Sequence, residues 1–256
     1  MHTITRLEAA NRRASRTIVD LDGEPWAEVD TEVVLRYNLH KGDRLEEEQA
    51  AALLAEDAFV RSRHAAALLL HARGRSIAEL RRKLRERGHG EASIERTIQY
   101  FADKGDLDDR VFAQTYAQHL FKTRCVGPGK VRYQLRRLGV GEGDISAALA
   151  AASGAGREHQ AEQARRLLER RLTNPRGLHP LRLKENLRQA LRRAGFDPDL
   201  SHELIEEAMR ERWPAAQESE EIVPAEAEGS PRRWGGKRPR ARSESESSVE
   251  DTDARR

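Results

Sequence analysis

The stretch from Arg75 to Ala113 reads RSIAELRRKLRERG, then HGEASIERTIQYFADKG, then DLDDRVFA, and it predicts three successive helices. Ser76 and Glu79 form a capping box, in which the hydroxyl and the carboxylate accept hydrogen bonds from free backbone amides of the first turn. Gly88 stands where a left-handed residue ends a helix. The apolar residues of the first two helices recur at helical spacing and are expected to share one core. They are Ile77, Leu80, Leu84, Ile94, Ile98 and Phe101.

The same pattern returns twice further along the chain. GKVRYQLRRLG ends at Gly139 and KENLRQALRRAG ends at Gly195, as AELRRKLRERG ends at Gly88. Each glycine has apolar residues four and eight positions before it and another ten positions after it. In order these are Leu84, Leu80 and Ile98; Leu135, Val131 and Leu149; and Leu191, Leu187 and Ile205. The glycines are 51 and 56 residues apart, which indicates stacked helical repeats whose units bury their apolar faces against one another.

Composition also favours small amphipathic helices over one large core. Of the 256 residues, 35% are charged, 38% are apolar and only 5% are aromatic, as is typical of helices with a single apolar face. We therefore predict a mainly α fold of tandem three-helix repeats, with a small N-terminal segment that contains a β-hairpin and a disordered C-terminal tail. The predicted segments are 1–60 (short strands plus a helix), repeats at 61–109, 110–155 and 156–213, and the tail at 214–256.

The N-terminal segment differs from the repeats. Residues 17–21 form a short β-type run, Asp22-Gly23 is a hairpin turn signal, and residues 26–29 can return as a second strand. Ile4 and Leu7 fit a preceding strand. A sheet of two or three strands is marginal alone, so we expect it to dock on a helix.

A helical pattern begins at Thr31 and breaks at residues 41–43. Residues 46–48, all glutamates, then crowd the first turn of another helix, where the helix dipole favours acidic side chains. This helix is predicted to end near Ser62 or to continue towards Leu70. The first repeat is expected to open with an apolar stripe made of Ala65, Leu68, Leu69 and Ala72.

Basic residues are concentrated in the middle of the chain. The net charge is −6 for 1–60, +10 for 61–140, +1 for 141–213 and −2 for 214–256. Such a basic face can attract phosphate backbones or an acidic protein groove. For any single arginine a solvated helix face is the simpler interpretation, whereas the cluster as a whole favours a functional one. The candidate contact residues are Arg81, Arg82, Arg85, Lys122, Arg124, Lys130, Arg132, Arg136 and Arg137.

The segment from Lys122 to Lys130 has two interpretations. Gly127 and Gly129 permit a tight turn, and the helix that follows begins with free amides beside basic side chains, a combination that can bind an anion. A plain loop between two helices explains the same residues. The segment is not a phosphate loop, because the Gly-Lys-Ser/Thr ending is missing.

Few residues suggest catalysis or metal binding. Cys125 is the only cysteine, so no internal disulfide and no cysteine zinc site can form. The neighbouring Arg124 can lower a thiol pKa, but without a base and an orienting group an inert thiol is the simpler interpretation. His64 and His71 lie almost two helical turns apart, too far for one metal. We expect no enzyme activity, no metal site and no cofactor.

The ends of the chain carry further expectations. No run of 18 apolar residues exists, and residues 1–20 lack the apolar core of a signal peptide, so we expect a cytoplasmic protein. From Pro214 onward, acidic residues at 218–228 precede basic residues at 232–242 and a Ser/Glu-rich end. This composition cannot bury enough apolar surface to order itself.

Four motifs resemble those of the bacterial RecX family of recombination regulators. They are ITRLE near the N-terminus, RSIAELRRKLRERG, GDLDDRVFA (105–113) and GPGKVRYQLRRLGV (127–140), and the likeness is most specific from about Arg63 to Ala152. Asp108 and Asp109 match the family's LDD motif, although helix capping explains both adequately. The resemblance implies tandem three-helix units in an elongated, curved molecule. It further implies a regulatory protein, not an enzyme, that binds RecA filaments on single-stranded DNA and restrains or disassembles them.

Two functions follow as hypotheses. The first is a RecA modulator in homologous recombination and DNA repair, acting as a monomer that reaches single-stranded DNA directly or through the filament. In this hypothesis the basic candidates make the contacts, whereas Leu80, Leu84, Phe112 and Leu135 belong to the core. The alternative is a stand-alone helical DNA-binding module, because the helix pairs resemble a helix-turn-helix; it predicts tight DNA binding without RecA.

Overall fold

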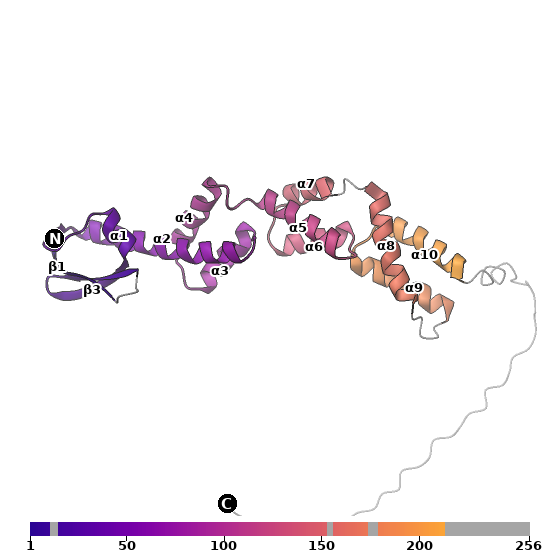
Figure 1. The fold of residues 1–256 in the computed structure, drawn as a ribbon, viewed down its shortest axis with the longest axis horizontal. Coiled ribbons are helices and arrows are strands. Elements are labelled where there is room, and N and C mark those ends of the chain that lie inside the picture. The colour runs from indigo at the N-terminus through magenta and orange to yellow at the C-terminus, as the bar shows by residue number, and fades with distance from the viewer. Residues whose placement is uncertain (11–14, 153–155, 174–178, 213–256) are drawn as a thin grey trace, which may run out of the picture. The chain divides into compact units, whose positions relative to one another are not determined.

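Four short strands and ten helices make up the computed structural model, which describes the chain except residues 11–14, 153–155, 174–178 and 213–256 (Figure 1). The predicted tail at 214–256 therefore lies outside the described residues. Across the described residues, no helix is both long enough and apolar enough to cross a membrane. The mainly helical fold with three-helix repeats and an N-terminal hairpin, predicted from the sequence, is confirmed.

An antiparallel sheet lies at the N-terminus. It contains β1 (His2–Ala9), β2 (Arg16–Leu21), β3 (Glu24–Asp30) and β4 (Arg44–Leu45) in the order β3-β2-β1-β4. Asp22 and Gly23 have φ angles of 53° and 93°, which are the left-handed conformations of a two-residue hairpin turn, and the predicted β2–β3 hairpin is confirmed. The sheet has one strand more than predicted, because β4 is only two residues long and has no alternation to reveal it.

The sheet packs against α1 (Thr31–Arg36) and the first half of α2 (Glu47–Ala72), and residues such as Val19, Val33 and Phe59 share one core. The 26 residues of α2 extend over about 39 Å at 1.5 Å per residue. The helix therefore passes residue 60, where the sequence suggested a boundary, without a break. Its predicted continuation towards Leu70 is confirmed, and the alternative end near Ser62 is wrong.

Unit 1 consists of the second half of α2 with α3 (Ile77–Glu86) and α4 (Glu91–Asp103). Its core holds the predicted apolar residues of α3 and α4. The predicted stripe on α2 is partly wrong: Leu69 is buried and Ala65 half-buried, but Leu68 is 70% exposed and Ala72 is also exposed, while Ala66, outside the predicted stripe, is buried. Because α2 serves two cores in succession, its apolar residues lie on more than one face and blur the periodic signal.

The capping box predicted at Ser76 and Glu79 forms only in part. The Ser76 hydroxyl accepts the Glu79 amide at 3.1 Å, as predicted. The Glu79 carboxylate instead accepts hydrogen bonds from the guanidinium groups of Arg73 and Arg75. A complete capping box lies at the start of α2, between Glu46 and Gln49.

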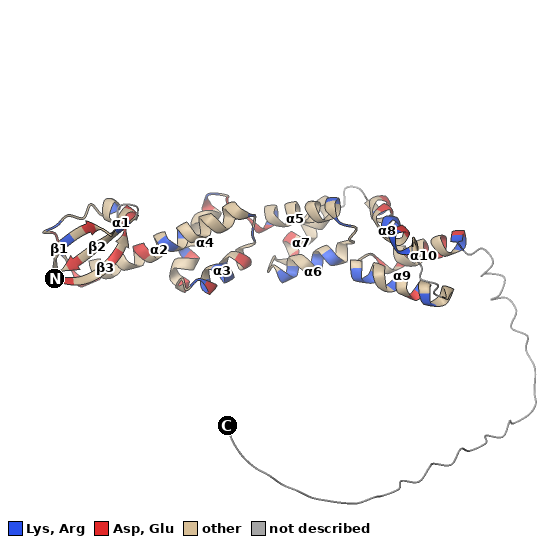
Figure 2. Ribbon diagram, turned by 60° about the horizontal axis from the view of Figure 1, so that its bottom comes forward, with Lys and Arg blue, Asp and Glu red and all other residues tan. Residues whose placement is uncertain are grey.

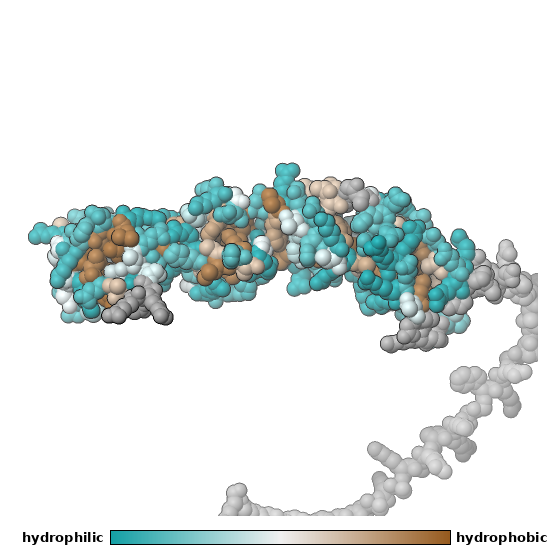
Figure 3. All heavy atoms as spheres, viewed as in Figure 1, coloured by the Kyte–Doolittle hydropathy of each residue, from teal (hydrophilic) through white to brown (hydrophobic). Residues whose placement is uncertain are grey.

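Units 2 and 3 repeat the three-helix arrangement. Unit 2 comprises α5 (Asp109–Thr123), α6 (Pro128–Arg137) and α7 (Glu142–Ala152), and unit 3 comprises α8 (Gly156–Leu172), α9 (Pro180–Ala194) and α10 (Pro198–Arg212). Each unit has its own apolar core, and Figure 3 shows brown, apolar residues in patches on an otherwise mostly teal surface. All nine apolar positions predicted from the repeat are buried. Gly88, Gly139 and Gly195 have φ angles of 81°, 81° and 80°, which confirms their left-handed helix ends.

The same joint links successive units. The Leu138 carbonyl, at the end of α6, accepts a hydrogen bond from the Ser76 hydroxyl at the start of α3. One repeat later, the carbonyls of Ala194 and Gly195, at the end of α9, accept the amides of Gly127 and Gly129 at 2.8 and 2.9 Å. Each helix end thus docks on the start of the preceding unit's equivalent helix, where the helix dipole favours carbonyl oxygens.

Buried carboxylates hold the N-terminal sheet and unit 1 to their common helix. Glu56 and Asp57 of α2 are 5% and 3% exposed. Glu56 pairs with Arg36 of α1 and Arg96 of α4, and Asp57 accepts the backbone amide of Asp30 at 2.7 Å. Because a buried charge is tolerated only when it is paired, these contacts fix α1 and α4 against α2.

Candidate functional site

Unit 2 contains a long run of sequence whose charged residues are all basic. From Arg110 to Gly141 the sequence has seven Lys and Arg residues and no Asp or Glu. Residues 61–109 carry eleven basic and eight acidic residues, so the charges of unit 1 are mixed, whereas this run of unit 2 is purely basic. Figure 2 shows α6 in blue and tan without red. A segment with this charge balance attracts polyanions.

α6 uses two of its faces for the fold. Val131 and Leu135 are fully buried in the core of unit 2. Arg132 and Arg136 share the carboxylate of Glu142 at the start of α7, with Nε to oxygen distances of 3.5 and 2.8 Å. These two candidates therefore link α6 to α7.

The candidates of unit 1 also have carboxylate partners. Arg81 forms a two-pronged pair with Glu95 at 2.7 and 2.9 Å, and this hydrogen bonding lowers the pKa of Glu95. Arg85 pairs with Glu91 at 2.8 Å. Arg82 lies 3.7 Å from Glu86. All three arginines remain accessible to solvent, but each is partly neutralised by a neighbour.

Two of these ion pairs occupy equivalent positions in units 1 and 2. Arg85 and Glu91 in unit 1 lie 51 positions before Arg136 and Glu142 in unit 2, which is the spacing of the repeat itself. Recurrence at the same position indicates that the pair holds the second and third helices of a unit together. In unit 3 the position of the glutamate is taken by Pro198.

Four of the nine candidates have no carboxylate within 4 Å in the described part of the chain, namely Lys122, Arg124, Lys130 and Arg137. Lys122 and Arg124 stand at the end of α5, where the helix dipole favours cations. Lys130 and Arg137 lie on α6 and flank the ring of Tyr133. Together with Arg110, these four side chains supply the unneutralised positive charge of unit 2, and we treat the four as the candidate site.

The two aspartates of the LDD motif have different structural roles. Asp108 caps α5 by accepting the amides of Arg110 and Val111, as expected. Asp109 accepts the Ile77 amide at 2.8 Å and so caps α3 of unit 1. Burial raises the pKa of Asp109, the Ile77 hydrogen bond lowers it, and the nearby carboxylate of Asp144 raises it further.

The anion site suggested at the start of α6 is wrong. The amides of Gly127 and Gly129 donate to backbone carbonyls of unit 3, and Pro128 has no amide hydrogen to offer. Cys125 is a half-buried free thiol. Over the described residues, no three His, Cys, Asp or Glu side chains are close enough to hold a metal ion.

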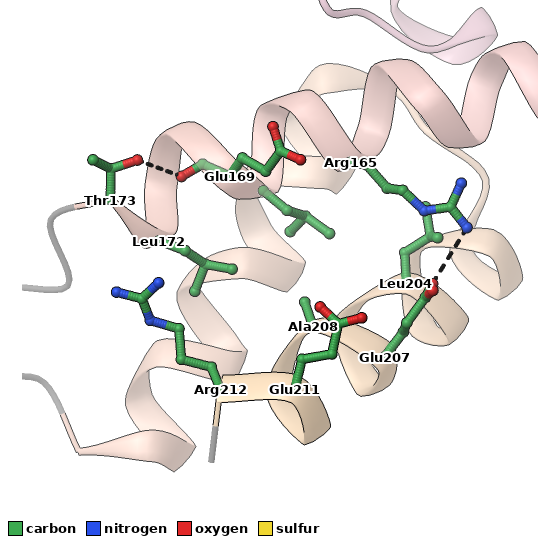
Figure 4. A pocket seen from close by; sticks show the side chains of 10 residues that line it. Arg165, Glu169, Leu172, Thr173, Leu204, Glu207, Ala208, Glu211 and Arg212 are labelled. Carbon is green, nitrogen blue, oxygen red and sulfur yellow. Dashed lines mark hydrogen bonds and ion pairs between the residues drawn. The ribbon is translucent and has the colours of Figure 1, made fainter. Parts of the chain in front are cut away.

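A pocket of about 720 Å³ lies between α8 and α10 in unit 3 (Figure 4). Leu168, Leu172 and Leu204 contribute its apolar part, and charged residues of both signs surround them. Arg165 pairs with Glu207 across the pocket at 3.3 Å. With the charges nearly balanced, this pocket has no preference for a polyanion, so the candidate site remains on unit 2.

Sequence reasoning missed Tyr133 on α6. Its side chain is 55% exposed, although α6 turns its other bulky apolar side chains into the core. An alignment of the three repeats on their glycines would have revealed this residue. The position six residues before the glycine holds Arg82 in unit 1 and Gln189 in unit 3, so an aromatic residue there is particular to unit 2.

Comparison with known proteins identifies the family. Residues 63–101 match a model described as "RecX, first three-helix domain", and residues 108–149 match "RecX, second three-helix domain". Regulatory protein RecX of Halalkalibacterium halodurans is 30% identical over 245 residues, which cover 93% of this chain and 89% of that protein. The RecX of Limosilactobacillus reuteri is 29% identical over 207 residues, covering 81% and 76% of the two chains.

Solved structures agree with this result. A crystal structure of regulatory protein RecX has a TM-score of 0.66 and 28% identity, and the match covers 81% of this chain and all of the other. The RecX structure from Lactobacillus salivarius, at 22% identity and a TM-score of 0.53 over 59% of this chain, shares the fold. The chain belongs to the RecX family of regulatory proteins.

Proposed function

We propose that this protein binds RecA filaments on single-stranded DNA and inhibits the recombinase and ATPase activities of RecA, and that it thereby modulates homologous recombination and DNA repair in the cytoplasm. Membership of a family of regulatory proteins supports a role that acts through a partner. The single observation that carries the proposal is the segment from Arg110 to Gly141, with seven basic and no acidic residues. A filament offers such a surface both phosphates and acidic protein groups.

The contact residues proposed are the four unpaired cations Lys122, Arg124, Lys130 and Arg137. The other five candidates act through the same surface to a lesser degree, because their charge is shared with glutamates of α3, α4 and α7. A basic side chain that already has a carboxylate partner gains less from a second anion, since the first pair must be weakened.

A matched pair of variants tests this proposal by co-sedimentation with RecA filaments assembled on single-stranded DNA. The site variant replaces the four unpaired cations by alanine. The control replaces four arginines of unit 3, each paired with a glutamate, and so removes the same formal charge: Arg157, Arg165, Arg166 and Arg188. We expect the site variant to lose about ten-fold or more in affinity, as several lost ionic contacts imply, and the control to bind as the native chain does.

Equal loss in both variants would contradict the assignment of the contact surface, since net charge alone would then explain binding. The alternative function, a stand-alone DNA-binding module, draws on the same charge. It predicts tight binding to duplex DNA without RecA. Binding to the filament that is far stronger than binding to either DNA form alone would exclude this alternative.

A further inference from the structure

Tyr133 is an exposed aromatic residue that the repeat does not require. Its side chain is 55% exposed. The two other units fold with Arg82 and Gln189 at the equivalent position, so packing of a three-helix unit needs no aromatic ring there. The second tyrosine of unit 2, Tyr116, is half-buried and donates its hydroxyl hydrogen to Gln134 at 3.2 Å. The Tyr133 hydroxyl has no hydrogen-bond partner among the described residues, and more than half of the residue is open to solvent.

Two cations flank this ring. The Lys130 Nζ lies 5.6 Å from the ring centroid, and the Arg137 Cζ lies 6.0 Å from it. The three residues are spaced i, i+3 and i+7 and therefore share one helix face. In unit 1 the positions of the two cations are held by Glu79 and Glu86. The combination of a ring with a cation before and after it is thus special to unit 2 among the three repeats.

We propose that Lys130, Tyr133 and Arg137 form a binding platform for single-stranded nucleic acid, in which one base stacks on the tyrosine ring and the two cations hold the phosphates on either side of that base. Stacking on an aromatic side chain and pairing of phosphates with cations are the two interactions by which proteins hold single strands regardless of sequence. Neither Lys130 nor Arg137 has a carboxylate within 4 Å in the described chain, so both are available to phosphates.

The ring and its two cations together favour a single strand over two other occupants. An acidic protein surface pairs with cations wherever they lie and does not require one before and one after a ring. In duplex DNA the faces of the bases are already stacked on one another, so a ring on a helix surface cannot reach them. A single strand offers both an open base face and flanking phosphates.

This inference deepens the proposed function, because it rests on DNA at the same basic surface and puts a strand in direct contact with α6. Its test needs no RecA. The full-length chain is titrated into a fluorescently labelled oligothymidylate, and separately into an oligomer of the same length and charge made of abasic sites. An oligouridylate of equal length shows whether the platform accepts RNA as well as DNA.

Tyr133→Ala is expected to weaken binding to oligothymidylate about ten-fold, the loss typical of one stacked base, and to leave binding to the abasic oligomer unchanged. Tyr133→Phe should bind both oligomers as the native chain does. Lys130→Ala combined with Arg137→Ala should weaken both. Tyr37→Ala, at a tyrosine of similar exposure after α1, is the matched control and should change neither.

Unchanged binding of oligothymidylate by Tyr133→Ala would overturn the proposal. An equal loss of affinity of Tyr133→Ala for the two oligomers would also overturn it, because the ring would then not contribute by stacking on a base. Inhibition of RecA by the native chain, measured in parallel, separates the two claims. Stacking on free DNA without any effect on RecA would contradict only the proposed function, whereas inhibition of RecA without stacking would contradict only the platform.

Discussion

At the scale of single residues, Gly88, Gly139 and Gly195 share one backbone conformation but differ in their neighbours. An alanine Cβ would meet nothing at Gly88, would overlap the side chain of Ala78 at Gly139, and would overlap the Lys130 backbone at Gly195. The left-handed conformation alone costs a non-glycine residue about 1 kcal/mol. Replacement by alanine should therefore lower the free energy of unfolding least at Gly88, more at Gly139 and most at Gly195.

Urea unfolding of the three alanine variants measures this order directly. Gly90→Ala serves as the control, because its Cβ would meet nothing and its φ of −72° suits any residue. Equal losses at the three left-handed glycines would mean that the joints between units contribute nothing beyond backbone conformation.

Asp109 provides a residue-scale prediction about pH. Its pKa in the folded chain is raised above the ordinary 3.8, so the native state disfavours the charged form. Stability is therefore lost as the pH rises from about 3.8 through the raised folded pKa and is constant above it. Asp109→Asn keeps an oxygen that can accept the Ile77 amide and removes the charge facing Asp144.

An amide side chain does not titrate, so Asp109→Asn should gain stability over the native chain through that pH window and keep the gain at neutral pH. Thermal unfolding followed by circular dichroism across the window gives the comparison. A variant less stable than the native chain at neutral pH would show that the charge itself, and not the oxygen acceptor, is what the Ile77 amide requires.

At the scale of elements, the repeat predicted helices and cores well because it depends on local periodicity. The residues four and eight positions before each glycine are buried in all three units. Two features were misjudged, one because arginines four and six residues away compete for a carboxylate, and one because its partner lies far away in the sequence. Glu79 left the capping box for Arg73 and Arg75, and the start of α6 is occupied by the end of α9.

The buried face of α6 carries an element-scale prediction. Leu135 is fully buried, and Leu135→Ala should lower the free energy of unfolding by about 2 to 5 kcal/mol through lost burial and a residual cavity. Leu181 of α9 is 65% exposed, so Leu181→Ala should change stability little. Chemical denaturation of both variants tests the contrast, and a loss at Leu135 no larger than at Leu181 would refute the assigned face of α6.

From the sequence, only the charge composition of the candidate site could be predicted, not which of its residues are free of ion pairs. The sequence located the positive charge, but it could not tell Arg136 from Arg137, which are adjacent. Only the fold shows that Arg136 pairs with Glu142 while Arg137 lies beside Tyr133. Ion pairs between helices depend on how the helices pack, and that packing has no signature in local spacing.

At the scale of the whole molecule, the three-helix units have similar cores and similar net charge but differ in how their charged residues are arranged. The units share one joint and one pattern of buried residues, whereas the run from Arg110 to Gly141, with seven basic and no acidic residues, belongs to unit 2. Binding through such charge should weaken with added salt, with a slope of about 0.7 per phosphate contact on a single strand. The site variant that lacks Lys122, Arg124, Lys130 and Arg137 should therefore show a shallower salt dependence than the native chain.

The most direct test of the central claim is the DNA-dependent ATP hydrolysis of RecA, titrated with the native chain and with the site variant at low and at moderate salt. The account predicts that the native chain inhibits hydrolysis at low salt and less so at moderate salt, and that the site variant is at least about ten times less potent at low salt. Full inhibition by a folded site variant, or no inhibition by the native chain at either salt concentration, would contradict it.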